Sequence, residues 1–271
     1  MSKPPLGLIA GSGRLPMLFA SAARAGGHPV HAAGHLGETD PALATQVDSL
    51  IWIKVGQVDA IIEAFKAHGV DRAVMAGGIG RVRSLTHARP DTGMLKIAAS
   101  LRSLRDDEFL RGIAHYFEKH GITIVAPTDY VQSVIAVEGH LAGPQLSTEQ
   151  EADIALGREV AGAMGHADVG QTVIVKAGVV LAVEAVEGTD EAIRRAGRLG
   201  GPGAVVVKRA KPGQDLRFDL PAAGTVTLEV MRESGAKVLA VEAGKTVLID
   251  GALLFKWAAK LGITVVGIRV E

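Results

Sequence analysis

The feature that most constrains the fold is a regular alternation of short apolar runs and helical stretches in the first half of the chain. The apolar runs are LGLIAG, HPVHAAG, SLIWIKV, DRAVMAGG and ITIVAPT, and they are bounded by glycines or polar residues. Helical patterns lie between them at Leu15–Ala25, Val58–His68 and Asp91–His120. Strands separated by helices at this interval are typical of a parallel sheet covered on both faces. We therefore predict a Rossmann-like first domain over residues 1–134.

After Pro127 the pattern loosens, and residues 135–147 read as a linker punctuated by glycine and proline. Ser147 with Gln150, or Thr148 with Glu151, resembles a capping box that opens a helix to about Met164. Residues 148–271 then alternate strands and helices less regularly. Two apolar strands joined at KAGV predict a hairpin, and further strands are expected at AVVVK, VLAVEAG, TVLI and ITVVGIRV, with helices at 190–199, 226–234 and 250–261. We expect a mixed α/β second domain.

Size and composition narrow the function. The chain has 271 residues, more than a usual single domain, which favours two domains. Lys plus Arg and Asp plus Glu number 29 each, so there is no broad field to collect nucleic acid or membrane phosphates, and any polyanion must be recognised locally. The absence of cysteine excludes a disulfide framework, a catalytic thiol and a thiolate zinc site. With no signal-peptide pattern and no apolar run near the roughly 20 residues of a membrane helix, we expect a soluble cytoplasmic protein.

The first chemical candidate is the loop Gly11, Ser12 and Gly13, which follows a strand and opens a helix. Backbone N–H groups at such a helix start can bind a phosphate. The dinucleotide fingerprint would need a third glycine where Pro16 stands, and an acid where the second strand ends in AAG. Binding of NAD is therefore disfavoured. Phosphate binding and a plain strand-to-helix turn both stay open.

A second glycine-rich loop, MAGGIGRVRS, also follows a strand and lies where ligands gather in parallel sheets. Gly77, Gly78 and Gly80 would let a ligand approach the backbone, and Arg81 could meet a phosphate; a turn with a solvated arginine is the alternative. The histidines, His28, His31 and His35 among them, show no metal-binding spacing and are expected to be incidental. No Gly-x-Ser-x-Gly elbow supports serine catalysis.

The most charged stretch is KRAKPGQDLRFDLP at 208–221. If residues 214–220 are extended, Asp215, Arg217 and Asp219 share one face. Carboxylates suit magnesium or manganese, and Lys208 and Lys211 could neutralise a diphosphate. An exposed ion cluster of little energetic worth is the alternative.

The stretch VEAVEGTDEA ends a strand at Glu187 and Gly188 and starts a helix at Thr189 and Asp190. It offers N–H groups, a hydroxyl and acids at one point, either as part of a site or as a plain helix cap. The later stretch AVEAGKT likewise ends a strand in Glu and Gly.

Three stretches, LIAGSGRLP, VEAVEGTD and KRAKPGQDLRFDLP, together resemble the LpxI-type UDP-2,3-diacylglucosamine pyrophosphatases of lipid A biosynthesis. The similarity runs in order over nearly the whole chain, although AAGTVT departs from the family pattern just after the acids. The resemblance implies a Rossmann-like first domain, a family-specific second domain and a lipid-bearing substrate held between them. It also implies metal-dependent attack of water on the α-phosphorus, giving UMP and 2,3-diacylglucosamine 1-phosphate.

The resemblance implies that Asp219, and next Asp215, is the metal ligand or catalytic acid, with Mg²⁺ or Mn²⁺ as cofactor and Lys211 and Arg217 beside them. The residues expected to bind substrate are Gly11, Ser12, Gly13, Gly78, Gly80, Arg81, Thr128, Gln171, Thr189, Asp190, Lys208 and Gln214. The expected partner is a lipid-linked UDP-sugar, met in transient contact with the inner membrane surface, with a homodimer as one option. A non-catalytic nucleotide-sugar sensor and a nicotinamide oxidoreductase are the rival functions.

Overall fold

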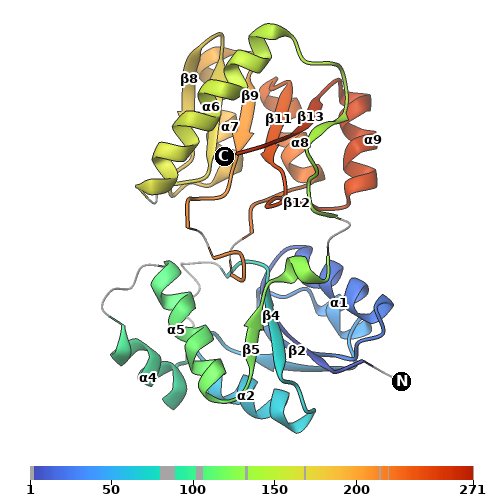
Figure 1. The fold of residues 1–271 in the computed structure, drawn as a ribbon, viewed down its shortest axis with the longest axis vertical. Coiled ribbons are helices and arrows are strands. Elements are labelled where there is room, and N and C mark those ends of the chain that lie inside the picture. The colour runs from blue at the N-terminus through green and yellow to red at the C-terminus, as the bar shows by residue number, and fades with distance from the viewer. Residues whose placement is uncertain are drawn as a thin grey trace. The chain divides into compact units, whose positions relative to one another are not determined.

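The computed structural model describes residues 3–79, 89–101, 106–131, 134–167, 169–213, 215–218 and 220–270 (Figure 1). These residues form two compact units. The first comprises Met1–Gln132 together with Asp215–Phe218, and the second comprises Ser133–Gln214 together with Asp219–Glu271. A short segment from the second half of the sequence thus belongs to the first unit.

The first unit is built on a parallel sheet in the order β3-β2-β1-β4-β5. Its strands are β1 (Leu6–Ala10), β2 (Val30–His35), β3 (Ser49–Ile53), β4 (Arg72–Ala76) and β5 (Thr123–Val125). The chain runs outward from β1 to β3 and then returns to β4, which pairs with β1 on its other side. Ligands of such sheets bind at this reversal, beyond the carboxyl ends of the strands.

Helices cover both faces of this sheet, which confirms the predicted Rossmann-like architecture. Helix α1 (Leu15–Ala25) packs on β1, β2 and β4, and buries Phe19. Helices α2 (Val58–Ala67), α4 (Thr92–Ser100) and α5 (Asp106–Lys119) pack with the opposite face of the sheet. The helical segment expected over 91–120 is therefore two helices, a correction to the sequence prediction. Helix α4 ends because Leu101 adopts an extended conformation.

The second unit contains a mixed sheet in the order β6-β13-β11-β9-β7-β8. Its three parallel strands are β13 (Thr264–Ile268), β11 (Val238–Glu242) and β9 (Val205–Lys208). The antiparallel strands are β6 (Gly139–Ala142), β7 (Thr172–Lys176) and β8 (Val179–Val183), and a separate parallel pair joins β10 (Ala222–Ala223) to β12 (Val247–Leu248). This sheet confirms a mixed α/β second domain.

Side chains of alternating positions in β9 face opposite layers of the second unit. Val205 and Val207 pack toward α6 (Thr148–His166), whereas Val206 joins the core beneath α7 (Thr189–Gly200), α8 (Thr225–Ser234) and α9 (Gly251–Leu261). Burial on both faces explains why this strand reads as a continuous apolar run.

Hydrogen bonds confirm two local predictions for the second unit, the capping box and the hairpin. Ser147 and Gln150 form the capping box of α6, with reciprocal bonds of 3.2 and 3.0 Å. The turn at KAGV closes the β7–β8 hairpin, and the buried carboxylate of Asp153 accepts the N–H groups of Ala177 and Gly178. Residues 139–142, inside the expected linker, form the edge strand β6.

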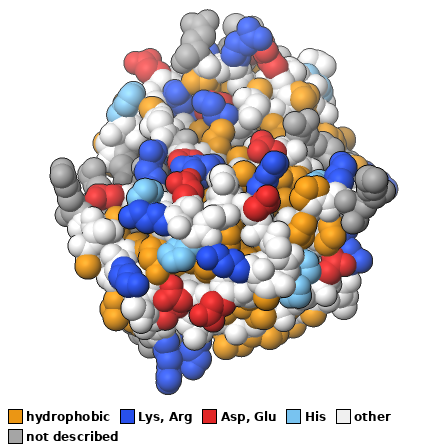
Figure 2. All heavy atoms as spheres, turned by 60° about the horizontal axis from the view of Figure 1, so that its bottom comes forward, with side chains coloured by type: hydrophobic (Ala, Val, Ile, Leu, Met, Phe, Trp, Pro, Cys, Tyr) orange, Lys and Arg blue, Asp and Glu red, His pale blue; other side chains and the backbone are white. Residues whose placement is uncertain are grey.

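The surface carries both signs of charge. In Figure 2, Lys and Arg side chains are interspersed with Asp and Glu, as the balanced composition leads one to expect. Within the described part of the chain, none of the helices has the length and apolar character needed to cross a bilayer.

Candidate active site

Two glycine-rich loops meet at the carboxyl edge of the first sheet, where β1 and β4 end. The N–H of Ser12 donates to the carbonyl of Gly78 at 2.7 Å, and the Ser12 hydroxyl donates to the same oxygen at 2.9 Å. A Cβ on Gly11 or Gly77 would collide with the backbone of the opposite loop. The glycines at these two positions are therefore explained by the close approach of the loops.

This contact changes what the first loop can offer a phosphate. The N–H of Gly11 donates to Ala76 at 2.8 Å and that of Ser12 to Gly78, so two of the three predicted phosphate donors are used within the protein. Gly13 differs, because it has φ of +86° and open space where a side chain would point. The start of α1 has no side-chain cap. Gly13 and the first turn of α1 therefore remain the part of this loop suited to an anion.

Of the other residues predicted in this half, Thr128 lies in the short helix Pro127–Asp129 that follows β5, and this helix contacts β4. Gly78 lies in the loop contact just described. Gly80 and Arg81 fall outside the described residues.

His35, at the end of β2, is not incidental as the sequence suggested. Its ring is buried, and Nδ1 donates to the carbonyl of Ala10 at 2.8 Å. Thr39 donates to the same carbonyl at 2.6 Å and accepts the N–H of His35. Burial lowers the pKa of His35, which favours the neutral ring. His35 thus supports the end of β1, directly before the glycine loop.

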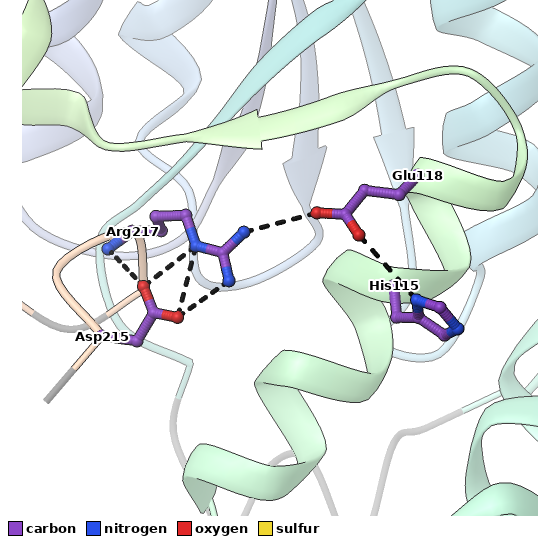
Figure 3. Close-up of polar contacts among 4 residues, drawn as sticks. All are labelled: His115, Glu118, Asp215 and Arg217. Atoms are coloured by element: carbon purple, nitrogen blue, oxygen red, sulfur yellow. Dashed lines mark hydrogen bonds and ion pairs between the residues drawn. The ribbon is translucent and has the colours of Figure 1, made fainter. Parts of the chain in front are cut away.

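The charged segment of the first unit is a turn, not the extended strand that the sequence predicted. Phe218 N–H donates to the carbonyl of Asp215 at 3.0 Å, which closes the turn. Alternation therefore does not place Asp215 and Arg217 on one face. They meet because Arg217 folds back, and its backbone N–H, Nε and Nη2 donate to the Asp215 carboxylate (Figure 3).

Arg217 also ties this turn to the helix α5. Its Nη1 lies 3.4 Å from Glu118, whose other carboxylate oxygen lies 3.8 Å from Nδ1 of His115 (Figure 3). The Arg217 guanidinium lies over the ring of Phe218, which packs against the core of the first unit. The hydrogen bond from Arg217 is the main cause that lowers the pKa of Asp215, and Asp215 in turn raises the pKa of Arg217. The pair stays ionised over the neutral range.

A second group of polar side chains gathers in the second sheet where β9 ends and the neighbouring strand β7 begins. β7 and β9 pair antiparallel with Thr172 opposite Lys208, so the start of one strand meets the end of the other. Lys208 is buried, and its Nζ donates to the hydroxyl of Thr189 at 3.0 Å. Thr189 donates to Glu184 at 3.0 Å and lies 3.3 Å from the hydroxyl of Thr172. We call Thr172, Glu184, Thr189 and Lys208 the lysine network.

The lysine network contains acceptors that the described residues leave unsatisfied. Glu184 Oε2 and Oε1 of the neighbouring Gln171 are buried without a hydrogen-bond partner among the described residues. Such an atom costs about 1–3 kcal/mol when no donor meets it, so these oxygens mark where a donor from a ligand would be favoured. The structure thus brings together the predicted residues Gln171, Thr189 and Lys208, with Asp190 in the first turn of α7.

Glu242 is a buried residue that the sequence reasoning did not select. It ends β11, and one of its oxygens accepts the N–H of Ala210 at 2.9 Å. Its other oxygen pairs with Lys245 at 2.7 Å. Glu242 therefore fixes the backbone directly before Lys211. The available signal was the strand ending in Glu and Gly in AVEAGKT, whose glutamate is Glu242. The strand end expected at Glu187 is wrong, because β8 ends at Val183 and the buried acid is Glu184.

Glycines of α6 fix the course of the same loop. A Cβ at Gly157 would lie 2.5 Å from Val207, one at Gly162 would lie 2.7 Å from Arg209, and one at Gly165 would lie 2.5 Å from Pro212. Helix α6 thus approaches β9 and the loop after it closely at Gly157 and Gly165, whereas the contact at Gly162 is with the end of the Arg209 side chain. Lys211, predicted to be catalytic, lies in this loop.

The described residues do not present a complete metal site. Within the described ranges no group of three or more His, Asp or Glu side chains is arranged to hold a metal ion. Both oxygens of Asp215 already accept from Arg217, so Asp215 does not fit the role of ligand in this arrangement. Asp219 and Gln214, the neighbouring predicted site residues, lie in the part of the segment that the structure does not describe.

The fold and these polar groups define a two-unit α/β protein with a buried polar network of Lys208, Thr189 and Glu184 in its second unit. The sequence matches the LpxI N-terminal domain over residues 5–134 and the LpxI C-terminal domain over residues 137–266. The chain belongs to the LpxI family. It is similar to the UDP-2,3-diacylglucosamine pyrophosphatase LpxI of Caulobacter vibrioides (strain ATCC 19089 / CIP 103742 / CB 15), with 33% identity over 97% of each chain.

Solved structures are more distant. The biotin carboxylase domain of a thermophilic 2-oxoglutarate carboxylase bound to ADP has 18% identity and a TM-score of 0.27, and the alignment covers 73% of this chain and 33% of that one. Biotin carboxylase from Campylobacter jejuni has 16% identity and a TM-score of 0.28, with 72% and 41% covered. The chain thus spans less than half of each of these proteins. Likenesses at this level carry no argument about function.

Proposed function

We propose that the protein hydrolyses the diphosphate of UDP-2,3-diacylglucosamine in lipid A biosynthesis. Water attacks the α-phosphorus and the products are UMP and 2,3-diacylglucosamine 1-phosphate. The observation that carries this proposal is the relative named for that activity, which is 33% identical over 97% of this chain. The lysine network is in keeping with it, because the ammonium of Lys208 and the hydroxyls of Thr172 and Thr189 are donors of the kind that phosphate oxygens accept from, and they lie beside the carboxylate of Glu184.

Hydrolysis of a diphosphate requires little covalent chemistry from the protein. The protein must orient a water molecule and offset charge on the phosphate oxygens. We assign charge neutralisation to Lys208 and Lys211 and phosphate positioning to Gln214 and Arg217, with Thr189 and Asp190 contributing to the pocket. Gly13 and the start of α1 are assigned to the nucleotide side.

The acid that we assign to metal binding is Asp219. This choice follows from the pairing of Asp215 with Arg217, which engages both Asp215 oxygens. Asp219 would hold a Mg²⁺ or Mn²⁺ ion, whose chemistry would be to make water a better nucleophile and to offset charge on the phosphate oxygens. Magnesium commonly takes only one or two protein carboxylates beside phosphate and water, so one acid from this segment suffices. Asp215 is then a positioning residue that holds Arg217.

The test uses the lipid substrate in ¹⁸O-labelled water. Label in UMP supports attack on the α-phosphorus, whereas label in the lipid phosphate would place the attack on the other phosphorus. Asp219→Ala should lower turnover at least about 100-fold, as expected when an electrostatic partner of the transition state is lost. Near-normal release of UMP by the folded variant would overturn the role of Asp219. Substrate binding without turnover in the unmodified protein would instead favour a sensor.

A further inference from the structure

Helix α9 presents an unusual outer face. Leu253 and Trp257 lie four residues apart and are 45% and 38% exposed. Lys256 and Lys260 are also exposed, and at 100° per residue the four side chains share one stripe of the helix. Leu254 and Ala258, which point the other way, are fully buried. The inner face of α9 thus fills the core while the outer face combines large apolar groups with lysines.

The charge of this face is one-sided. The residues from Gly251 to Leu261 include two lysines and no acid. Neighbouring helices differ, since Arg194 pairs with Glu191 on α7 and Arg232 with Glu229 on α8. A helix with exposed Leu and Trp beside lysines has the composition of one that lies in the interface of an anionic membrane.

The location of this face also suits a protein that acts on a lipid. Helices α8 and α9 pack together, and they begin just after β10 and β12, which pair with each other. Val226, at the start of α8, is 68% exposed. Strand β12 begins at Val247, and the preceding Thr246 donates its N–H to the carbonyl of Glu242 at 3.1 Å. The exposed apolar groups therefore start near the sheet edge that carries Glu242.

We propose that the outer face of α9 is the surface by which the protein lies on an anionic bilayer, with Leu253 and Trp257 inserted at the headgroup level. The lysines would meet anionic headgroups, each adding about 1 kcal/mol. A second copy is a poorer occupant, because a two-fold contact would bring Lys256 and Lys260 of both copies together. The proposal rests on the proposed function only because a lipid substrate explains why the protein would bind a membrane. Binding to vesicles itself needs no substrate.

The first experiment uses the two tryptophans of the chain as reporters. The variant Trp52→Phe leaves Trp257 alone, and Trp257→Phe leaves Trp52, which is 40% exposed on β3, as the matched control. Vesicles of phosphatidylglycerol and phosphatidylethanolamine should shift the fluorescence of Trp257 to shorter wavelength and leave that of Trp52 unchanged. Vesicles of phosphatidylcholine alone, or high salt, should weaken the effect. An equal shift of both tryptophans would overturn the assignment.

The second experiment measures vesicle co-sedimentation of full-length variants. Lys256→Gln with Lys260→Gln should weaken binding about 30-fold, which corresponds to about 2 kcal/mol. Lys66→Gln with Lys96→Gln, which changes two exposed lysines of the first unit, is the control and should bind like the unmodified protein. Three results would each overturn the proposal. They are an equal loss of vesicle binding in both double variants, no vesicle binding by the unmodified protein, and a dimer of the unmodified protein that Leu253→Asp dissociates.

Hydrolysis of detergent-dispersed substrate separates this proposal from the function on which it draws. The α9 variants should release UMP at the normal rate in detergent and lose activity only on substrate held in vesicles. If the unmodified protein binds anionic vesicles but releases no UMP, the hydrolase proposal fails while the membrane surface stands. If it releases UMP yet ignores vesicles, the surface fails alone.

Discussion

The guanidinium of Arg217 lies against both carboxylate oxygens of Asp215, with Nη2 2.8 Å from Oδ2 and Nε 3.0 Å from Oδ1. The same side chain reaches Glu118 on α5. A fork of donors on a planar group can make these contacts together, and a lysine ammonium cannot. The turn that precedes Asp219 is thus fixed by one arginine.

We expect Arg217→Lys to lower kcat by about 10-fold to 100-fold while the protein stays folded. Charge-assisted hydrogen bonds contribute about 1.5–3 kcal/mol, and the lysine would lose the paired contacts that hold the turn. A double-mutant cycle with Asp215→Asn checks the cause, because the two effects should be far from additive. Additive losses would show that Arg217 acts without Asp215.

Glu242→Ala should lower kcat about 10-fold or more, because it removes the acceptor that fixes Ala210 before Lys211. Glu242→Gln keeps an oxygen for that N–H and should recover most of the activity. Lys245→Ala is the control, since it breaks the ion pair at the exposed partner and leaves the Ala210 contact in place. Equal kcat for the Ala and Gln variants at Glu242 would contradict the positioning role.

Gly165→Ala tests the close approach of α6 to the loop that carries Lys211. In a helix this change normally stabilises a protein by about 1 kcal/mol. Here the added Cβ would lie 2.5 Å from Pro212 and 3.2 Å from the Cα of Lys211, so we expect lower activity and no gain in thermal stability. The exposed neighbour Ala163 offers a control in Ala163→Ser. A stabilised, fully active Gly165→Ala protein would show that the loop yields freely.

The pKa of His35 predicts a loss of stability in mild acid. Burial lowers its folded pKa below the ordinary value of about 6.5, so the unfolded chain binds the proton more readily. The unfolding free energy should be at its plateau above about pH 6.5 and fall as the pH drops below it. Denaturant titrations of His35→Asn should show a shallower decline. The pKa of His31 is lowered too, mainly by burial, so His31→Asn measures its share of the slope.

Removal of metal is expected to stop hydrolysis. Exhaustive EDTA treatment should abolish release of UMP, and Mg²⁺ or Mn²⁺ should restore it, because the proposed reaction needs charge on the phosphate oxygens to be offset. Calorimetric titration of metal into Asp219→Ala should show weaker binding than titration into Asp215→Asn. Full activity after chelation would overturn the cofactor assignment.

The strand and helix alternation predicted the first sheet because each parallel strand is buried on both faces and reads as an apolar run. It could not predict the turn at Asp215, since period-two alternation holds only if the segment is extended. Glu242 was missed because its partner, the N–H of Ala210, lies 32 residues away in the chain. Glu184 was missed although its partner Thr189 follows five residues later, because the sequence placed the end of the strand at Glu187 and β8 ends at Val183. Gly11 and Gly77 were noticed, but their explanation is a contact between loops that a sequence does not display.

The presence of Phe218 in the core of the first unit has a consequence for dissecting this protein. The first unit is discontinuous in sequence, and a fragment cut after residue 134 would lack the aromatic ring that packs beside α5. Gene fusions that take the amino-terminal half from one relative and the remainder from another would combine that half with a segment 215–218 that comes from a different protein. Successful chimaeras should therefore carry the short segment 215–218 along with the half to which it belongs.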